Sequence, residues 1–426
     1  MSSNSKPYVI LIDGDSFFWS CELIFRPDLI GKPGIILSNN DGCAVSRNRL
    51  AKKLGIAMGD PYFKIRNLCE ENGVIAFSSN FELYLDISRR FKQILKEEVG
   101  GIEDYSVDES FASWNIRMDL KKFAKHLRFR LLREVGIPTT VSIAPSKVLA
   151  KVGSRIGKND PKMEGVMFFH SHIEADSYLK EISVDKLWGI GRGRHLQLRC
   201  LGVHSAYDLK YYDNTKLLRK NLTKAVVQIR DELHGIECFP VTEIPEKKKE
   251  IMSTRTFFRS VYTKFELARA LSDHISDASA ELRLQGSVAK EVTIYLSSNR
   301  HRDGIEQYSF KKSMRIGSAT DNTFRLIELA LSMLELGFKN GIEYKRSGIK
   351  LSQLEDNYEY TLSLFDPIES EKVSKLITAM DIINSRFGKR KVRSLSCSTD
   401  NLTWKMNRSN LSPAYTTNFN ELPICG

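Results

Sequence analysis

The feature that most constrains this chain is a pair of acidic sites, each placed at the end or bend of an expected strand. The apolar run 8–12 is predicted to be a buried strand, and it stops at the turn-rich stretch Asp13–Ser16. A second strand-like segment, 104–114, carries Asp108 and Glu109 in its middle. A carboxylate between two core-facing neighbours does not suit a straight strand, so we expect a hairpin tip at these two residues.

Carboxylates that converge from neighbouring strand ends form a hard-oxygen site suited to Mg²⁺. Asp13, Asp108 and Glu109 together could hold two ions, and two ions about 3.5–4 Å apart activate an attacking hydroxyl and neutralise a leaving oxygen. Two alternatives stay open from the residues alone. Residues 13–16 could simply cap the following helix. Strand-Asp-x-Asp also begins haloacid-dehalogenase-type phosphatases, although these usually continue with Gly-Thr, whereas this chain continues with Ser-Phe-Phe.

The charge of the chain favours a phosphate-rich partner. Its 426 residues have a formal net charge of +12, and the stretch 115–158 holds eleven Lys and Arg against two Asp and Glu. Such a basic stretch suits a nucleic-acid backbone, although a solvated helix face would have the same composition. The sequence has no apolar run of about 20 residues, and its seven cysteines form no Cys-x-x-Cys pair. We therefore expect a cytoplasmic protein with no membrane partner, signal peptide or zinc site.

Periodicity predicts several domains along the chain. A basic amphipathic helix is expected at 121–135, with Phe123, Leu127 and Leu131 on one stripe, and is followed by a strand and a second basic helix. Two short helices are expected around Gly189–Gly191. After a proline- and lysine-containing linker, an α+β domain is expected over 251–351, with strands at 291–297 and 306–311 and helices at 265–284 and 321–338. Beyond residue 351 the pattern weakens into a polar tail.

Seven motifs, in order from about Tyr8 to Thr417, resemble those of Y-family DNA polymerases, and several are typical of the UmuC branch. They are Asp13–Phe18, Ser38–Cys43, Met58–Lys64, Ser106–Phe111, Ser142–Lys151, Trp404–Met406 and Leu411–Thr417. The resemblance implies an α+β right hand with a ferredoxin-like palm, small fingers, a helical thumb with a helix-hairpin-helix, and an α+β little-finger domain. The implied bounds are 1–20 and 75–165 for the palm, 21–74 for the fingers, 166–238 for the thumb, 239–250 for a linker, 251–351 for the little finger and 352–426 for a tail with a clamp-binding peptide.

The resemblance also implies roles for individual residues. Asp13, Asp108, Glu109 and the backbone carbonyl of Gly14 match ligands of two Mg²⁺ ions. The expected nucleotide-binding residues are Phe17, Phe18 as the steric gate against ribonucleotides, Ser46, Arg49, Lys52 and Lys147. Many relatives outside this branch have Tyr and Arg at positions 49 and 52, so the separate roles of Arg49 and Lys52 stay open. Expected DNA contacts are Gly189, Gly191, Arg192 and Arg194, and the expected clamp-binding peptide contains Leu362, Leu364 and Phe365, with Thr361 in place of the usual Gln.

The function implied by the resemblance is error-prone translesion synthesis in the SOS response, without proofreading. The implied partners are primer-template DNA, a deoxynucleoside triphosphate, a sliding clamp, a UmuD-like dimer and a RecA filament. The sequence leaves open which lesions are bypassed and whether the last two partners are required. A different class of function, a DNA-binding accessory subunit with a degenerate polymerase fold, is disfavoured by the intact acids at 13, 108 and 109.

Overall fold

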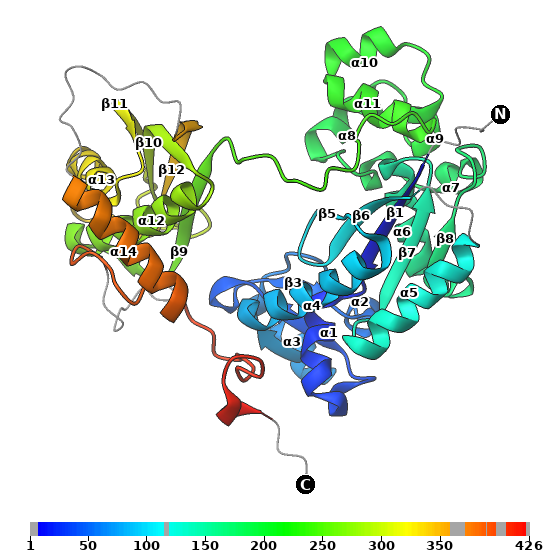
Figure 1. Cartoon of the computed structure of the whole chain (residues 1–426), viewed down its shortest axis with the longest axis horizontal. Coiled ribbons are helices and arrows are strands. Elements are labelled where there is room, and N and C mark those ends of the chain that lie inside the picture. The colour runs from blue at the N-terminus through cyan, green and yellow to red at the C-terminus, as the bar shows by residue number, and fades with distance from the viewer. Residues whose placement is uncertain (1–6, 115–118, 358–370, 389, 398–405, 423–426) are drawn as a thin grey trace. The chain divides into compact units, whose positions relative to one another are not determined.

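The structure, a computed structural model, describes residues 7–114, 119–357, 371–388, 390–397 and 406–422. The chain divides into two compact units (Figure 1). Unit 1 comprises residues 1–245 together with 409–426, and unit 2 comprises residues 246–408. Within the described ranges, no helix is both long enough and apolar enough to cross a membrane.

The centre of unit 1 is a five-stranded sheet in which β1 is the middle strand. The strand order is β5 (Glu103–Asp104), β6 (Glu109–Trp114), β1 (Tyr8–Gly14), β7 (Thr139–Ala144) and β8 (Val166–Phe168). All neighbours are antiparallel except β7 and β8, which are parallel. Because both faces of the sheet are covered, β1 is apolar at every position from 9 to 12 rather than at alternate positions.

Helices cover both faces of this sheet. Ile10 and Ile12 pack with residues of three helices: α1 (Phe17–Phe25), α4 (Phe81–Val99) and α5 (Leu120–Glu134). Val9 and Leu11 point to the opposite face, where they pack with α6 (Lys147–Asn159). The basic helix predicted at 121–135 is confirmed as α5, and its buried stripe includes Phe123, Leu127 and Leu131.

A second, smaller sheet of unit 1 is formed by residues 34–78, most of which belong to the expected fingers. Its strands lie in the order β3 (Ala44–Arg47), β2 (Gly34–Leu37) and β4 (Ile75–Ser78), with helices α2 (Arg49–Lys53) and α3 (Tyr62–Glu71). Gly34 is required where β2 meets α1, since a Cβ at this position would lie 2.0 Å from the ring of Trp19. This smaller sheet therefore packs directly on the helix that follows β1.

Helices follow β8 in unit 1. They are α7 (Asp176–Glu181), α8 (Arg192–Cys200), α9 (Ala206–Lys210), α10 (Thr215–Asn221) and α11 (Lys224–Leu233). Their buried side chains join the core formed by Val9, Leu11 and α6, so this thumb-like region shares one hydrophobic cluster with the palm sheet. The predicted short helices on either side of Gly189–Gly191 correspond to a 3-10 turn at Val184–Lys186 and to α8.

Unit 2 is an antiparallel sheet packed against helices. The strand order is β11 (Ser309–Thr320), β10 (Ser287–Ser298), β12 (Tyr344–Asp356) and β9 (Ile251–Val261), and the helices are α12 (Lys264–Leu284), α13 (Thr323–Gly337) and α14 (Glu371–Phe387). The two predicted helices correspond to α12 and α13. The strand predicted at 306–311 instead begins at Ser309 and runs to Thr320, and α14 lies in the stretch predicted to be a polar tail.

The C-terminal residues return to unit 1. Residues 371–397 belong to unit 2, whereas residues from 409 onward belong to unit 1, so the expected tail is divided between the units. The predicted clamp-binding residues Leu362, Leu364 and Phe365 lie outside the described residues.

Candidate active site

Strand pairing brings the predicted acidic residues together. Asp13 is the penultimate residue of β1, and it lies directly opposite Glu109, the first residue of β6, in the antiparallel register. Asp108 immediately precedes β6, and its carbonyl accepts a hydrogen bond of 2.9 Å from the N–H of Gly14. The Asp108 carboxylate accepts a 2.7 Å hydrogen bond from the hydroxyl of Ser106. The predicted hairpin is present as the β5–β6 pair, with its bend at residues 106–108.

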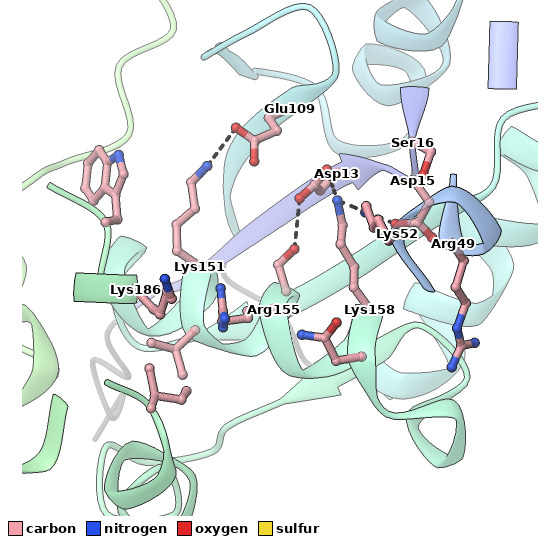
Figure 2. A pocket seen from close by; sticks show the side chains of 15 residues that line it. Asp13, Asp15, Ser16, Arg49, Lys52, Glu109, Lys151, Arg155, Lys158 and Lys186 are labelled. Carbon is pink, nitrogen blue, oxygen red and sulfur yellow. Dashed lines mark hydrogen bonds and ion pairs between the residues drawn. The ribbon is translucent and has the colours of Figure 1, made fainter. Parts of the chain in front are cut away.

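One face of α6 supplies the partners of these acids. Lys151, Ser154 and Lys158 follow the i, i+3, i+7 spacing that places side chains on one side of a helix. Lys158 Nζ lies 2.5 Å from Asp13 Oδ1, and the Ser154 hydroxyl donates to Asp13 Oδ2 over 3.0 Å. Lys151 Nζ lies 2.7 Å from Glu109 Oε2. Figure 2 shows Lys151 directed toward Glu109 and Lys158 directed toward Asp13.

Burial disfavours the charged forms of two carboxyl groups at the site, those of Glu109 and Asp15. The pKa of Glu109 is raised, first by burial and then by the negative charge of Asp13, against the opposing effect of Lys151. Burial also raises the pKa of Asp15, which accepts a hydrogen bond from Thr140. For Lys158, burial alone would lower the pKa, but the carboxylates of Asp13 and Asp15 outweigh it and raise the pKa. Crowded acids of this kind favour a bound cation.

The oxygen donors fit a hard divalent cation, which prefers carboxylates and keeps some of its waters. In the present side-chain arrangement, no group of three or more His, Cys, Asp and Glu side chains among the described residues is placed to hold a metal ion. Asp13 and Glu109 are instead bonded by lysines. Two observations fit Mg²⁺. Asp13 and Glu109 lie on paired strand ends, and their negative charges repel each other.

A pocket of about 650 Å³ opens over the acidic residues, and its lining contains more cationic than acidic side chains. Its charged lining residues are Asp13, Asp15 and Glu109, and Arg49, Lys52, Lys151, Arg155, Lys158 and Lys186. Arg49 and Lys52 come from α2, whose first turn is capped by the side chain of Asn48. With six cations against three acids, the pocket has the excess positive charge that a polyphosphate requires.

Lys147, by contrast, lies outside this pocket. Only 4% of its surface is exposed, and its ammonium group contacts Glu103 Oε2 at 2.5 Å and the carbonyl of Pro240 at 2.8 Å. Lys147 and Lys158 are eleven residues apart on one helix, which separates them by about 16 Å along its axis. Lys158, which is not among the residues predicted from the sequence, lines the pocket, whereas the predicted Lys147 does not.

The two phenylalanines of the first motif have different surroundings. Phe17 is 2% exposed and packs edge-to-face on Phe91 in the core. Phe18 is half-buried and stacks on Tyr84, with ring centroids 4.7 Å apart and an interplanar angle of 17°. Neither ring lines the pocket, and Ser46, on β3, also lies outside its lining. The structure therefore places Phe17, one of the expected nucleotide-binding residues, in the core, whereas Phe18 is only half-buried.

The capping alternative for the stretch 13–16 does not describe this structure. Ser16 precedes α1 with a φ of 47°, and its hydroxyl donates to the carbonyl of Arg47 over 3.2 Å instead of capping the helix. The carboxylates of Asp13 and Asp15 face α6 and Thr140. The side chains of this stretch are therefore directed into the site and not to the helix start.

The glycine-rich turn before α8 has the geometry of a tight turn between packed helices. Gly189 has a φ of +85°, and a Cβ at this position would lie 2.9 Å from Ile229 Cδ1. Gly191 precedes the first residue of α8, Arg192, and both are exposed. Arg194 donates to the carbonyl of Gly189 over 2.6 Å, so its guanidinium group helps to hold the turn.

Comparisons with known proteins agree with this architecture. Residues 12–155 match the impB/mucB/samB family, residues 248–364 match the C-terminal domain of that family, and residues 374–424 match a domain of unknown function, DUF4113. Protein MucB and Protein UmuC of Salmonella typhimurium are each 32% identical over 97% of this chain and 98% of their own length. A DNA polymerase IV from Desulfatibacillum aliphaticivorans is 26% identical over 92% of this chain and 97% of its own.

Solved structures support the same fold. A Y-family DNA polymerase chimera of Dbh and Dpo4 aligns with a TM-score of 0.62 at 20% identity, and an insertion ternary complex of Dbh DNA polymerase aligns with a TM-score of 0.56 at 21% identity. Each alignment covers 82% of this chain and 100% of the other. The chain belongs to the impB/mucB/samB family, the UmuC branch of the Y-family DNA polymerases.

Proposed function

We propose that this chain is an error-prone translesion DNA polymerase, which adds deoxynucleotides to a primer opposite damaged template bases during the SOS response. The observation that carries the proposal is the pocket in which acids at the ends of β1 and β6 face cations from α2 and α6. A deoxynucleoside triphosphate is an anion of matching size and charge for the cationic lining.

Asp13, Glu109 and Asp108 are the proposed ligands of two Mg²⁺ ions, together with the carbonyl of Gly14. When bound, the ions would activate the primer hydroxyl and neutralise the leaving pyrophosphate. The side chains of Lys158, Arg49 and Lys52 line the same pocket and would hold the triphosphate by charge-assisted hydrogen bonds. Because Lys158 contacts Asp13 directly, its ammonium group must leave that carboxylate to bind phosphate.

The test is primer extension with Mg²⁺ on an undamaged template and on one that carries a single abasic site. We expect extension past the lesion, with mismatched primer ends left uncorrected, as for a polymerase without proofreading. Asp108→Asn should lose extension and keep its affinity for primer-template DNA, since it removes a metal ligand and no phosphate contact. DNA binding without extension by the unaltered chain would favour the accessory-subunit alternative.

The peptide 361–365 is the proposed clamp-binding segment. Its apolar anchors Leu362, Leu364 and Phe365 would fill a pocket on a sliding clamp, as buried anchors usually carry most of the binding energy of a peptide. Leu364→Ala combined with Phe365→Ala should abolish stimulation by the clamp and leave extension of a short primer unchanged. Thr361→Gln should strengthen clamp binding. A UmuD-like dimer and a RecA filament are the further proposed partners, and adding each to the extension assay tests them.

A further inference from the structure

The C-terminal segment, defined here as residues 409–415, is built into unit 1. Asn410 exchanges two hydrogen bonds of 2.9 Å with Ser78, one from each backbone N–H. Tyr415 is 6% exposed, belongs to the same hydrophobic core as β1, and stacks on Phe25 with centroids 4.5 Å apart and planes 7° apart. A segment held by hydrogen bonds to Ser78 and by a buried ring is part of the folded unit.

Ser412 connects this segment to a carboxylate in the interior. Glu22, on α1, is fully buried, and its Oε1 accepts hydrogen bonds from the hydroxyls of Ser412, at 3.1 Å, and Tyr84, at 2.7 Å. Glu22 Oε2 has no hydrogen-bond partner among the described residues. Burial raises the pKa of Glu22, and the two hydroxyl donors act against that shift. A buried carboxyl group with so few donors depends strongly on each one.

The segment also reaches the start of α4. Asn80 caps this helix by accepting a hydrogen bond from the N–H of Leu83 at 3.3 Å. The side-chain amide of Asn80 donates to the Ser412 hydroxyl at 2.9 Å and to the carbonyl of Pro413 at 3.3 Å. Ser412 is therefore bonded both to α1 and to the start of α4. These two helices carry the stacked rings, Phe18 on α1 and Tyr84 on α4.

We propose that the C-terminal segment positions the sugar-selecting ring of the active site: Ser412, through Glu22 and Tyr84, fixes the stacked ring of Phe18. The proposal rests on the proposed role of Phe18 as the gate against ribonucleotides. A ring excludes a 2′-hydroxyl only if it is held in place, and the Tyr84 ring that holds it is itself anchored by its hydroxyl on Glu22. This gives a function to one part of the matched domain of unknown function.

The test compares incorporation of deoxynucleotides and ribonucleotides by Ser412→Ala and Tyr84→Phe. Each variant removes one hydroxyl donor from Glu22, and Tyr84→Phe keeps the ring that stacks on Phe18. We expect both to reduce the ratio of kcat/KM for deoxy- over ribonucleotide by about fivefold. Asn418→Ala is the matched control, because its half-buried side chain bonds, among the described residues, Glu421 and the backbone N–H of Asn420 and neither Glu22 nor Asn80.

A loss of overall activity with an unchanged ratio would overturn the proposal, since a purely structural role slows both substrates equally. Hydrogen exchange gives a second measurement that does not need activity. Ser412→Ala should speed exchange in α1 and at the start of α4 relative to α5, and equal exchange in all three would also overturn the proposal. If the unaltered chain adds no nucleotides, the proposed polymerase function fails, and the exchange result alone decides whether the segment holds these helices.

Discussion

Helices α5 and α6 come from the same basic stretch of sequence, yet they use their positive charges differently. On α5, Arg130 contacts the carboxylates of Glu97, Glu98 and Glu134 at 2.5–2.8 Å, on the outer side of the unit. On α6, Lys151 and Lys158 contact Glu109 and Asp13 in the active-site pocket. The comparison teaches that a count of basic residues cannot assign them to a ligand, because what matters is which acid each one faces.

The largest effect is expected from substitution of the carboxylates that are bonded by α6 and by α5. Glu109→Gln should reduce nucleotide addition by about a thousandfold or more, because it removes a proposed metal ligand. Glu98→Gln, which removes a carboxylate bonded by Arg130, is the matched control and should leave single-turnover extension unchanged. Equal effects of the two substitutions would show that the acids bonded by α6 are no more important for nucleotide addition than those bonded by α5.

A second pair extends the comparison to α1. Phe18→Ala should increase ribonucleotide incorporation relative to deoxynucleotide by about a hundredfold, because space opens beside the sugar. Phe17→Ala, which empties a buried core position, should mainly destabilise unit 1, by about 3–5 kcal/mol. Thermal denaturation together with competitive incorporation measures both outcomes. A selectivity change in Phe17→Ala alone would place the gate at that ring.

A third pair of substitutions compares Lys158 on α6 with Arg130 on α5. Lys158→Ala should reduce kcat/KM for the incoming nucleotide by about thirtyfold, because a charge-assisted contact to phosphate is lost. Arg130→Ala should leave this parameter within about twofold, since Arg130 does not line the pocket and its partners are Glu97, Glu98 and Glu134. Steady-state kinetics on one primer-template provides the values, and an unaffected Lys158→Ala would assign the phosphate contacts to α2 alone.

The smallest effect on chemistry is expected at the other end of α6. Lys147→Met should leave kcat/KM for the nucleotide nearly unchanged but lower the Tm by about 5–10 °C, since the half-buried carboxylate of Glu103 loses the ammonium group of buried Lys147. Calorimetry and extension assays on the same preparation separate the two effects. If nucleotide KM rises and Tm does not fall, Lys147 contacts the triphosphate as its motif suggested.

Local patterns predicted the parts of the site that depend on local structure. The apolar run before Asp13, the bend at Asp108 and the stripe of α5 are all visible in neighbouring residues. The acids that the lysines of α6 contact cannot be predicted from neighbouring residues. Whether a lysine faces Asp13 or Glu103 depends on how the helix crosses the sheet. The hydrogen bond between Ser412 and Glu22 joins residues 390 positions apart, and no periodicity can reveal such a contact.

The place of Tyr415 in the core of unit 1 has a consequence for how the protein is made. The ribosome delivers the chain from its N-terminus at about 5–20 residues per second, so roughly ten to thirty seconds separate the emergence of residue 245 from that of Tyr415. During that interval Glu22 lacks one of its donors and Phe25 lacks its stacking partner. A chain whose synthesis stops before residue 412 lacks these contacts, so the positioning that we propose for Phe18 depends on some of the last residues to be made.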